Sequence, residues 1–210
     1  MAAEYETIAG RVDTEIEISR SRFLTRLERV DSEDAARQVI AEVRAAHPRA
    51  RHHCSAFVIG PDGRVQRSND DGEPSGTAGA PMLDALVSAG LSDVVAVVTR
   101  YFGGVLLGAG GLTRAYRASV AGAVDHANRV RRGLRREVNV TSSYEVAAQI
   151  EAEARRRGYA VGVAEYSDVV VQRFAVSEEE VAALAALAAE LSAGGAQVVP
   201  GEAAFVDLGG

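Results

Sequence analysis

A run of valines constrains the fold of this chain more than any other feature. Four of the seven residues from 93 to 99 are valine, and a continuous apolar run this short is typical of a central buried strand. Five glycines follow within residues 103–111, and a helix is expected from Leu112 to about Asn128. The chain therefore contains a buried strand, a glycine loop and a helix in direct succession.

The residues before this run are predicted to mix strands and helices. Apolar and acidic side chains alternate from Val12 to Ile18, which is the pattern of a half-buried strand. Ser32 is expected to cap a helix that Pro48 ends. The predicted elements are strands at 12–18, 23–30, 55–60 and 64–68, helices at 32–47 and 80–89, and a loop at 69–79.

Residues 137–206 have a pattern of their own. Strands predicted at 137–144, 159–165, 169–176 and 197–206 alternate with two helices, at 145–157 and after Ser177. This βαββαβ order is that of a ferredoxin-like sandwich. We place a linker in the basic segment 129–136 and expect an α+β protein of two domains, at 1–132 and 137–208.

Charge is distributed unevenly between these two parts. The net charge of −6, taken alone, argues against a nucleic-acid-binding protein. However, residues 1–136 carry 19 arginines and 17 acidic residues, whereas residues 137–210 carry 4 and 12. Such an asymmetry indicates two domains with different partners.

Composition excludes several classes of protein. No run of 18 uncharged apolar residues exists, so we expect no membrane span. The N-terminal residues do not resemble a signal peptide and Cys54 is the single cysteine, which together predict a cytoplasmic protein. All 23 basic residues are arginine, which excludes Schiff-base chemistry and the lysine of a Walker A loop.

The first candidate site is the acidic loop, residues 70–79. Its oxygen-bearing side chains would suit a hard cation, or its carboxylates would contact a basic protein partner. Alternatively, the loop is solvated and its Asp and Ser side chains cap the next helix. The residues concerned are Asp70, Asp71, Glu73, Ser75 and Thr77.

The second candidate site is the glycine loop, residues 103–111, with the arginines around it. Backbone amides freed by glycine, together with a helix N-terminus, form an anion-binding concavity that would hold a phosphate or phosphodiester. Tyr101 and Phe102 would stack on bases. Alternatively, the glycines only permit a tight turn and close packing. The residues concerned are Arg100, Tyr101, Phe102, Gly103, Gly104, Gly108, Gly110, Gly111, Arg114 and Arg117.

Other motifs give little support to catalysis or metal binding. His52, His53 and Cys54 are adjacent, but neither a second cysteine nor other histidines lie at zinc-motif spacing. Ser75 lies outside a nucleophile elbow, and Thr113 stands where a dinucleotide fingerprint needs glycine. We therefore expect no metal and no cofactor, and we identify no catalytic residue.

Three segments together resemble the IMPACT family: residues 21–23, the acidic loop and residues 100–116. The resemblance covers about residues 5–130, and the two-domain length is similar to the bacterial YigZ branch. Leu106 departs from the lysine of many relatives and removes a positive charge beside the glycine loop. The matching positions are Asp70, Asp71, Glu73, Arg100, Gly103, Gly104, Gly110, Gly111 and Arg114.

The resemblance implies a first domain folded like the second domain of a small-subunit ribosomal protein. It implies a second domain like a C-terminal domain of elongation factor G. Eukaryotic relatives regulate translation initiation through a protein partner and are not enzymes, and structures of the bacterial branch point to nucleic-acid binding. The family supplies no catalytic role for the matching residues.

These observations support three hypotheses about function. The first is a non-enzymatic binding protein that contacts RNA or the ribosome and regulates translation. The second is a nucleotide- or phosphate-binding protein or enzyme, with Asp70 or Asp71 holding magnesium beside the glycine loop. The third is a protein-interaction module whose acidic loop binds a basic partner.

Overall fold

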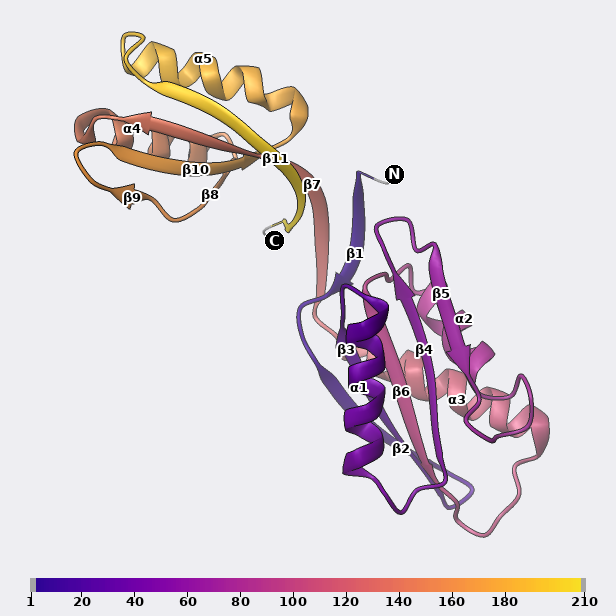
Figure 1. Cartoon of the computed structure of the whole chain (residues 1–210). Helices are drawn as coiled ribbons and strands as arrows, with labels where there is room; N and C mark the ends of the chain where they lie inside the picture. The colour runs from indigo at the N-terminus through magenta and orange to yellow at the C-terminus, as the bar shows by residue number, and fades with distance from the viewer. Residues whose placement is uncertain (1–2, 209–210) are drawn as a thin grey trace. The chain divides into compact units, whose positions relative to one another are not determined.

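A computed structural model describes residues 3–208 of the chain (Figure 1). The chain forms two compact units, the first ending at Arg131 and the second beginning at Arg132. Each unit combines helices with an antiparallel sheet, so the fold is α+β, as the sequence predicts. None of the helices in the described residues is long and apolar enough to cross a membrane.

The first unit is built on a five-stranded antiparallel sheet. The valine run forms its central strand, as predicted, because both faces of that strand are covered. Val94, Ala96 and Val98 belong to one apolar cluster, and Val95 and Val97 belong to another. The strand order is β2 (Val12–Ile18), β3 (Ser21–Arg29), β6 (Val94–Tyr101), β4 (His52–Ile59) and β5 (Val65–Asn69).

Helices cover both faces of this sheet (Figure 1). Helix α1 (Glu33–Ala46) packs Val39 and Val43 against Val95 and Val97, and the backbone N–H of Ala35 donates to its cap, Ser32. Helices α2 (Gly79–Ser88) and α3 (Gly108–Asp125) pack on the opposite face. The second face holds the larger core, which includes Phe23, Met82, Leu86, Tyr116 and Val120.

The elements differ from the sequence expectations at three places. Strand β1 (Glu4–Ile8), which pairs with β7, was not predicted. The segment 129–136, predicted as a linker, does contain the boundary between the two units, but it is part of strand β7 (Arg129–Ser142). Its arginines have acidic partners: Arg129 pairs with Glu6 and Arg136 with Glu178, at 2.9 and 2.7 Å. Finally, residues 108–111 begin α3 rather than ending a loop.

The second unit has the predicted ferredoxin-like βαββαβ order, with β7 as its first strand. Helices α4 and α5 pack on the sheet through Ile150, Leu184 and Leu187. The strands pair antiparallel in the order β11-β7-β10-β8, with β9 also on β10. The elements are α4 (Tyr144–Arg156), β8 (Ala160–Val161), β9 (Glu165–Tyr166), β10 (Val170–Val176), a 3₁₀ turn (Glu178–Glu180), α5 (Val181–Leu191) and β11 (Gln197–Asp207).

Candidate functional site

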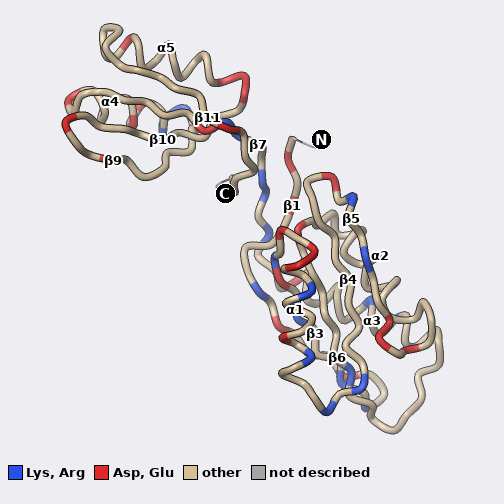
Figure 2. The backbone as a smooth tube through the Cα atoms, in the orientation of Figure 1, with Lys and Arg blue, Asp and Glu red and all other residues tan. Residues whose placement is uncertain are grey.

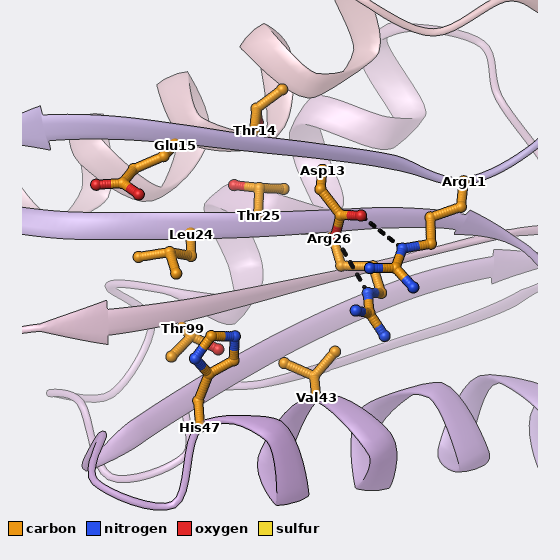
Figure 3. A pocket seen from close by; sticks show the side chains of 10 residues that line it. All are labelled: Arg11, Asp13, Thr14, Glu15, Leu24, Thr25, Arg26, Val43, His47 and Thr99. Carbon is orange, nitrogen blue, oxygen red and sulfur yellow. Dashed lines mark hydrogen bonds and ion pairs between the residues drawn. The ribbon is translucent and has the colours of Figure 1, made fainter.

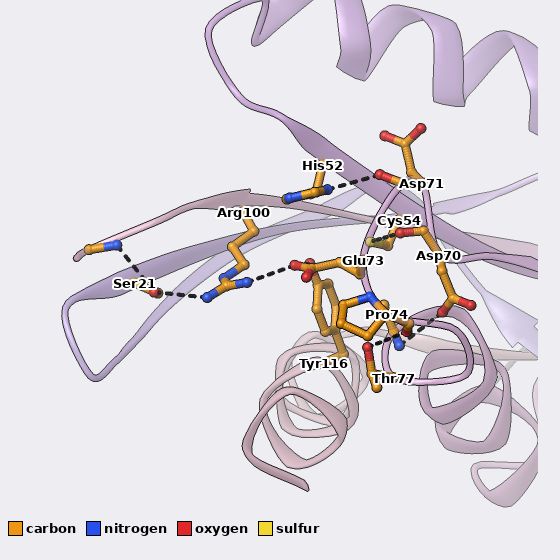
Figure 4. Close-up of polar contacts among 12 residues, drawn as sticks. Ser21, His52, Cys54, Asp70, Asp71, Glu73, Pro74, Thr77, Arg100 and Tyr116 are labelled. Carbon is orange, nitrogen blue, oxygen red and sulfur yellow. Dashed lines mark hydrogen bonds and ion pairs between the residues drawn. The ribbon is translucent and has the colours of Figure 1, made fainter. Parts of the chain in front are cut away.

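A buried ion pair joins the acidic loop to the end of β6, directly before the glycine loop (Figure 4). Arg100, near the end of β6, is 7% exposed, and its Nη1 donates to Oε1 of Glu73 at 2.9 Å. The Tyr116 hydroxyl donates to the same oxygen at 2.7 Å. Because both charged side chains are taken out of water, their pairing is necessary for either to be buried. Arg100 and Glu73 therefore support the fold here and are not free to bind a charged ligand.

The same network fixes the start of the glycine loop. Arg100 Nη2 and the backbone N–H of Gly103 both donate to Oγ of Ser21, at 3.4 and 3.2 Å. A Cβ on Gly103 would lie 1.9 Å from the carbonyl oxygen of Arg20, so this close approach requires glycine. Ser19 and Arg20 form the β2–β3 turn with φ of +50° and +63°. The glycine loop is therefore held tightly against this turn.

In the acidic loop, the carboxylate of Asp70 acts as a backbone cap. Its oxygens accept N–H bonds from Gly76, Ala78 and Gly79 at 2.8–3.0 Å. Partial burial opposes ionisation of Asp70, but these three donors outweigh it and lower its pKa. Asp70 therefore ties the loop to the start of α2, which agrees with the capping interpretation.

The other side chains of the acidic loop either form hydrogen bonds within the protein or lie apart from one another. Asp71 accepts from the N–H of His53 at 2.7 Å and from Arg44 at 2.8 Å. Thr77 is buried and donates to the Pro74 carbonyl, whereas Ser75 is exposed. No cluster of metal-ligating side chains occurs within residues 3–208. These contacts give no support to the hard-cation interpretation.

The solvent-facing feature beside the buried pair is a groove of about 530 Å³, which we call the basic groove. Strand register explains why it forms, because His52 of β4 pairs with Arg100 of β6 and so brings residues 49–51 to the end of β6. Phe102 and Leu106 are 57% and 87% exposed there. The groove is lined by Arg49, Ala50, Arg51, His52, Arg100, Tyr101, Phe102 and Leu106.

Arg49 and Arg51 are the groove residues that sequence reasoning missed. Neither arginine has an ion-pair partner in the part of the chain that the structure describes. By contrast, Arg22 pairs with Glu15 at 2.6 Å and Arg44 pairs with Asp71. The only sequence feature that could have indicated these groove residues is the occurrence of two arginines in the short segment after Pro48. Their positive charge is therefore available to an anionic ligand.

The basic groove continues onto the face of the sheet that carries α1. A second hollow shares Arg49 and Tyr101 with it, and a third, of about 340 Å³, shares Leu24 and His47 with the second. In the third hollow, Asp13 accepts from both Arg11 and Arg26 (Figure 3). Because its charges are already paired, the third hollow is a weaker candidate for binding an anion.

The remaining residues of the second candidate site do not line the groove together. Gly108, Gly110 and Gly111 lie in the first turn of α3, and Arg114 is exposed on that helix. Arg117 forms an ion pair with Asp84 of α2, so it bridges two helices rather than facing a ligand. Gly104 has a φ of +83° in the loop itself. The structure therefore brings Arg100, Tyr101 and Phe102 together and leaves Arg117 apart.

Cys54 and the histidines are packed strand residues. Cys54 is fully buried, its thiol donates to the Asp70 carbonyl at 3.1 Å, and burial raises its pKa to about 12. His53 lies 3.0 Å from Oγ1 of Thr99, and burial lowers its pKa. His52 Nδ1 contacts the Asp71 carbonyl at 2.9 Å. A thiol with so high a pKa is a poor nucleophile at neutral pH.

These features define a two-unit α+β protein with a basic, aromatic-lined groove on its first unit. Comparison with known proteins identifies its relatives. A model of the Impact N-terminal domain matches residues 19–124. IMPACT family member YvyE of Bacillus subtilis is 41% identical over 207 residues, which is 99% of this chain and 95% of that relative. The chain therefore belongs to the IMPACT family.

Two further comparisons agree with this assignment. IMPACT family member YigZ of Escherichia coli is 40% identical over 185 residues, covering 87% of this chain and 91% of that protein. A crystal structure of a hypothetical protein is 37% identical, with a TM-score of 0.66 over 96% of this chain and 99% of that one. The expectation of a YigZ-like member of the family is confirmed.

Proposed function

We propose that this protein is a non-enzymatic, cytoplasmic binding protein whose basic groove contacts RNA of the translation apparatus. The main support for the proposal comes from Arg49 and Arg51. Neither arginine has a carboxylate partner in residues 3–208, and both line the groove beside the exposed side chains of Phe102 and Leu106. Guanidinium groups with aromatic side chains are the usual means of binding single-stranded nucleic acid. Membership of the IMPACT family fits a translation-related regulator.

The net charge of −6 does not oppose this proposal. Most acidic side chains of the first unit lie away from the groove or pair with arginines, as Glu15 does with Arg22. Figure 2 shows arginines gathered at the end of the first unit where β6 ends. Phosphate binding depends on such a local cluster rather than on the average charge of the chain.

The two alternatives have weaker support. For a basic protein partner, the acidic loop offers little free charge, because Asp70 and Asp71 accept internal hydrogen bonds and Glu73 is buried. For a nucleotide, the first turn of α3 with Arg114 remains an anion-binding geometry. Neither Asp70 nor Asp71 presents a free oxygen pair beside it for magnesium.

Co-sedimentation with ribosomes and with total RNA, at low and high salt, tests the proposal. We expect binding at low salt that the double variant Arg49→Gln/Arg51→Gln loses. A matched control is Arg64→Gln/Arg67→Gln, which removes the same charge at the β5 end of the sheet, where Arg64 is 79% exposed. Absence of binding by the unmodified protein at low salt would overturn the proposal.

A further inference from the structure

Phe102 is an aromatic side chain that is both exposed and rigidly supported. It follows β6 directly and is 57% exposed at the edge of the basic groove. The guanidinium carbon of Arg100 lies 5.6 Å from the centroid of the Phe102 ring and 5.6 Å from that of Phe23. The guanidinium therefore lies between two rings, and one face of Phe102 rests on a buried cation. More than half of the residue's surface is open to solvent.

The buried network holds this arrangement in place. Arg100 is fixed by Glu73 on one side and by Ser21 on the other, at 2.9 and 3.4 Å. Ser21 also accepts the N–H of Gly103, the residue after Phe102. Phe102 is thus positioned before any ligand arrives, although it belongs to a loop. Such preorganisation reduces the entropy lost on binding.

The neighbouring aromatic residue does not offer an equivalent surface. The ring of Tyr101 has the Arg22 guanidinium 5.9 Å from its centroid, and its hydroxyl lies 3.1 Å from Nδ1 of His47. Leu106 is more exposed than Phe102 and lies in the same loop, but it has no π face. Phe102 is therefore the residue best placed for stacking, and Leu106 provides a comparison within the same groove.

We propose that Phe102 is a stacking platform for one unpaired nucleobase, with Arg49 and Arg51 binding adjacent phosphates, so that the groove takes single-stranded RNA. This inference rests on the proposed function and names the form of RNA that the groove binds. A base inside a duplex has both faces covered by its neighbours and cannot stack on a side chain. Stacking also tolerates any base, since every base has a π face.

The chain contains no tryptophan, which allows a direct test. In Phe102→Trp, the new indole is the only one, and a base stacked on it quenches its fluorescence. We expect quenching by a decamer of uridine and none by an RNA duplex of the same length. Tyr166→Trp in the second unit is the control, because Tyr166 is 67% exposed but far from the groove in sequence and in a different unit.

Affinity measurements on variants that lack tryptophan provide a second test. Fluorescence anisotropy of an end-labelled uridine decamer should show that Phe102→Ala weakens binding by about 5- to 150-fold. Leu106→Ala should weaken binding clearly less than Phe102→Ala, because Leu106 lines the groove but has no π face. Equal melting temperatures for the variants and the unmodified protein would exclude misfolding as the cause.

Three results would overturn the inference in distinguishable ways. Duplex bound as tightly as the decamer, or binding without quenching in Phe102→Trp, removes the stacking platform and leaves RNA binding intact. Equal losses in Phe102→Ala and Leu106→Ala indicate a general apolar contact instead. If the unmodified protein binds neither the decamer nor the duplex, both the inference and the proposed function are wrong.

Discussion

Arg100 and Glu73 form a buried ion pair that joins β6 to the acidic loop, with 2.9 Å between Nη1 and Oε1. The side chains are 8% and 4% exposed. Two conspicuous features of the sequence thus meet inside the protein, not on its surface. The pair supports Phe102 and the groove next to it, while the ligand-facing charge comes from Arg49 and Arg51.

Replacing only one partner of this ion pair should lower the free energy of unfolding much more than replacing both partners. Glu73→Leu leaves the Arg100 guanidinium buried without a carboxylate, and we expect a loss of about 3–5 kcal/mol in the free energy of unfolding. Arg100→Met in the same chain should restore most of that loss, apart from the acceptor that Tyr116 has lost. Urea denaturation of both single variants and the double variant measures the coupling. Additive losses would show that the pair is not coupled.

Gly103 should resist even the smallest side chain. In Gly103→Ala the methyl group would lie 1.9 Å from the Arg20 carbonyl oxygen, so the loop or the turn must move, at a cost of about 1–3 kcal/mol. Gly122→Ala is the matched control in α3, where nothing lies within 4 Å, and it should stabilise by about 0.8–1 kcal/mol. Thermal unfolding distinguishes the two. A neutral Gly103→Ala would contradict the close packing.

Asp70 should make the stability of the folded protein vary with pH in the acid range. Its pKa is lowered in the folded protein, so its contribution is fully present above its unfolded pKa of about 3.9 and is lost as pH falls through the folded value. Asp70→Asn should therefore be less stable than the unmodified protein at pH 6, and the difference should shrink below about pH 4. Urea midpoints between pH 6 and pH 2 measure this. A difference that does not vary with pH would exclude the capping carboxylate as its source.

The local elements of this fold could be predicted from sequence, because periodicity and caps act within a few residues. The valine run, the Ser32 cap and the βαββαβ order are of this kind. The start of α3 could not, since glycine has a low helix propensity and residues 108–111 read as a loop. The segment 129–136 read as a linker because its acidic partners are distant in sequence.

The site was only partly predictable, for a related reason. Arg100, Tyr101 and Phe102 stood out beside the glycines, but nothing local indicates that Arg100 is buried against Glu73, 27 residues away. Arg49 and Arg51 resemble ordinary solvated loop residues until the β4–β6 register brings them to the end of β6. Long-range register, which sequence patterns do not encode, decides which charges face solvent.

The salt dependence of RNA affinity tests whether Arg49 and Arg51 hold phosphates. For single strands, the slope of log K against log salt is about −0.7 for each phosphate contact. If Arg49 and Arg51 each hold a phosphate, Arg49→Gln/Arg51→Gln should reduce the slope for a uridine decamer by about 1.4, whereas Arg64→Gln/Arg67→Gln leaves it unchanged. Equal slopes for all three proteins would show that the basic groove does not bind the RNA backbone.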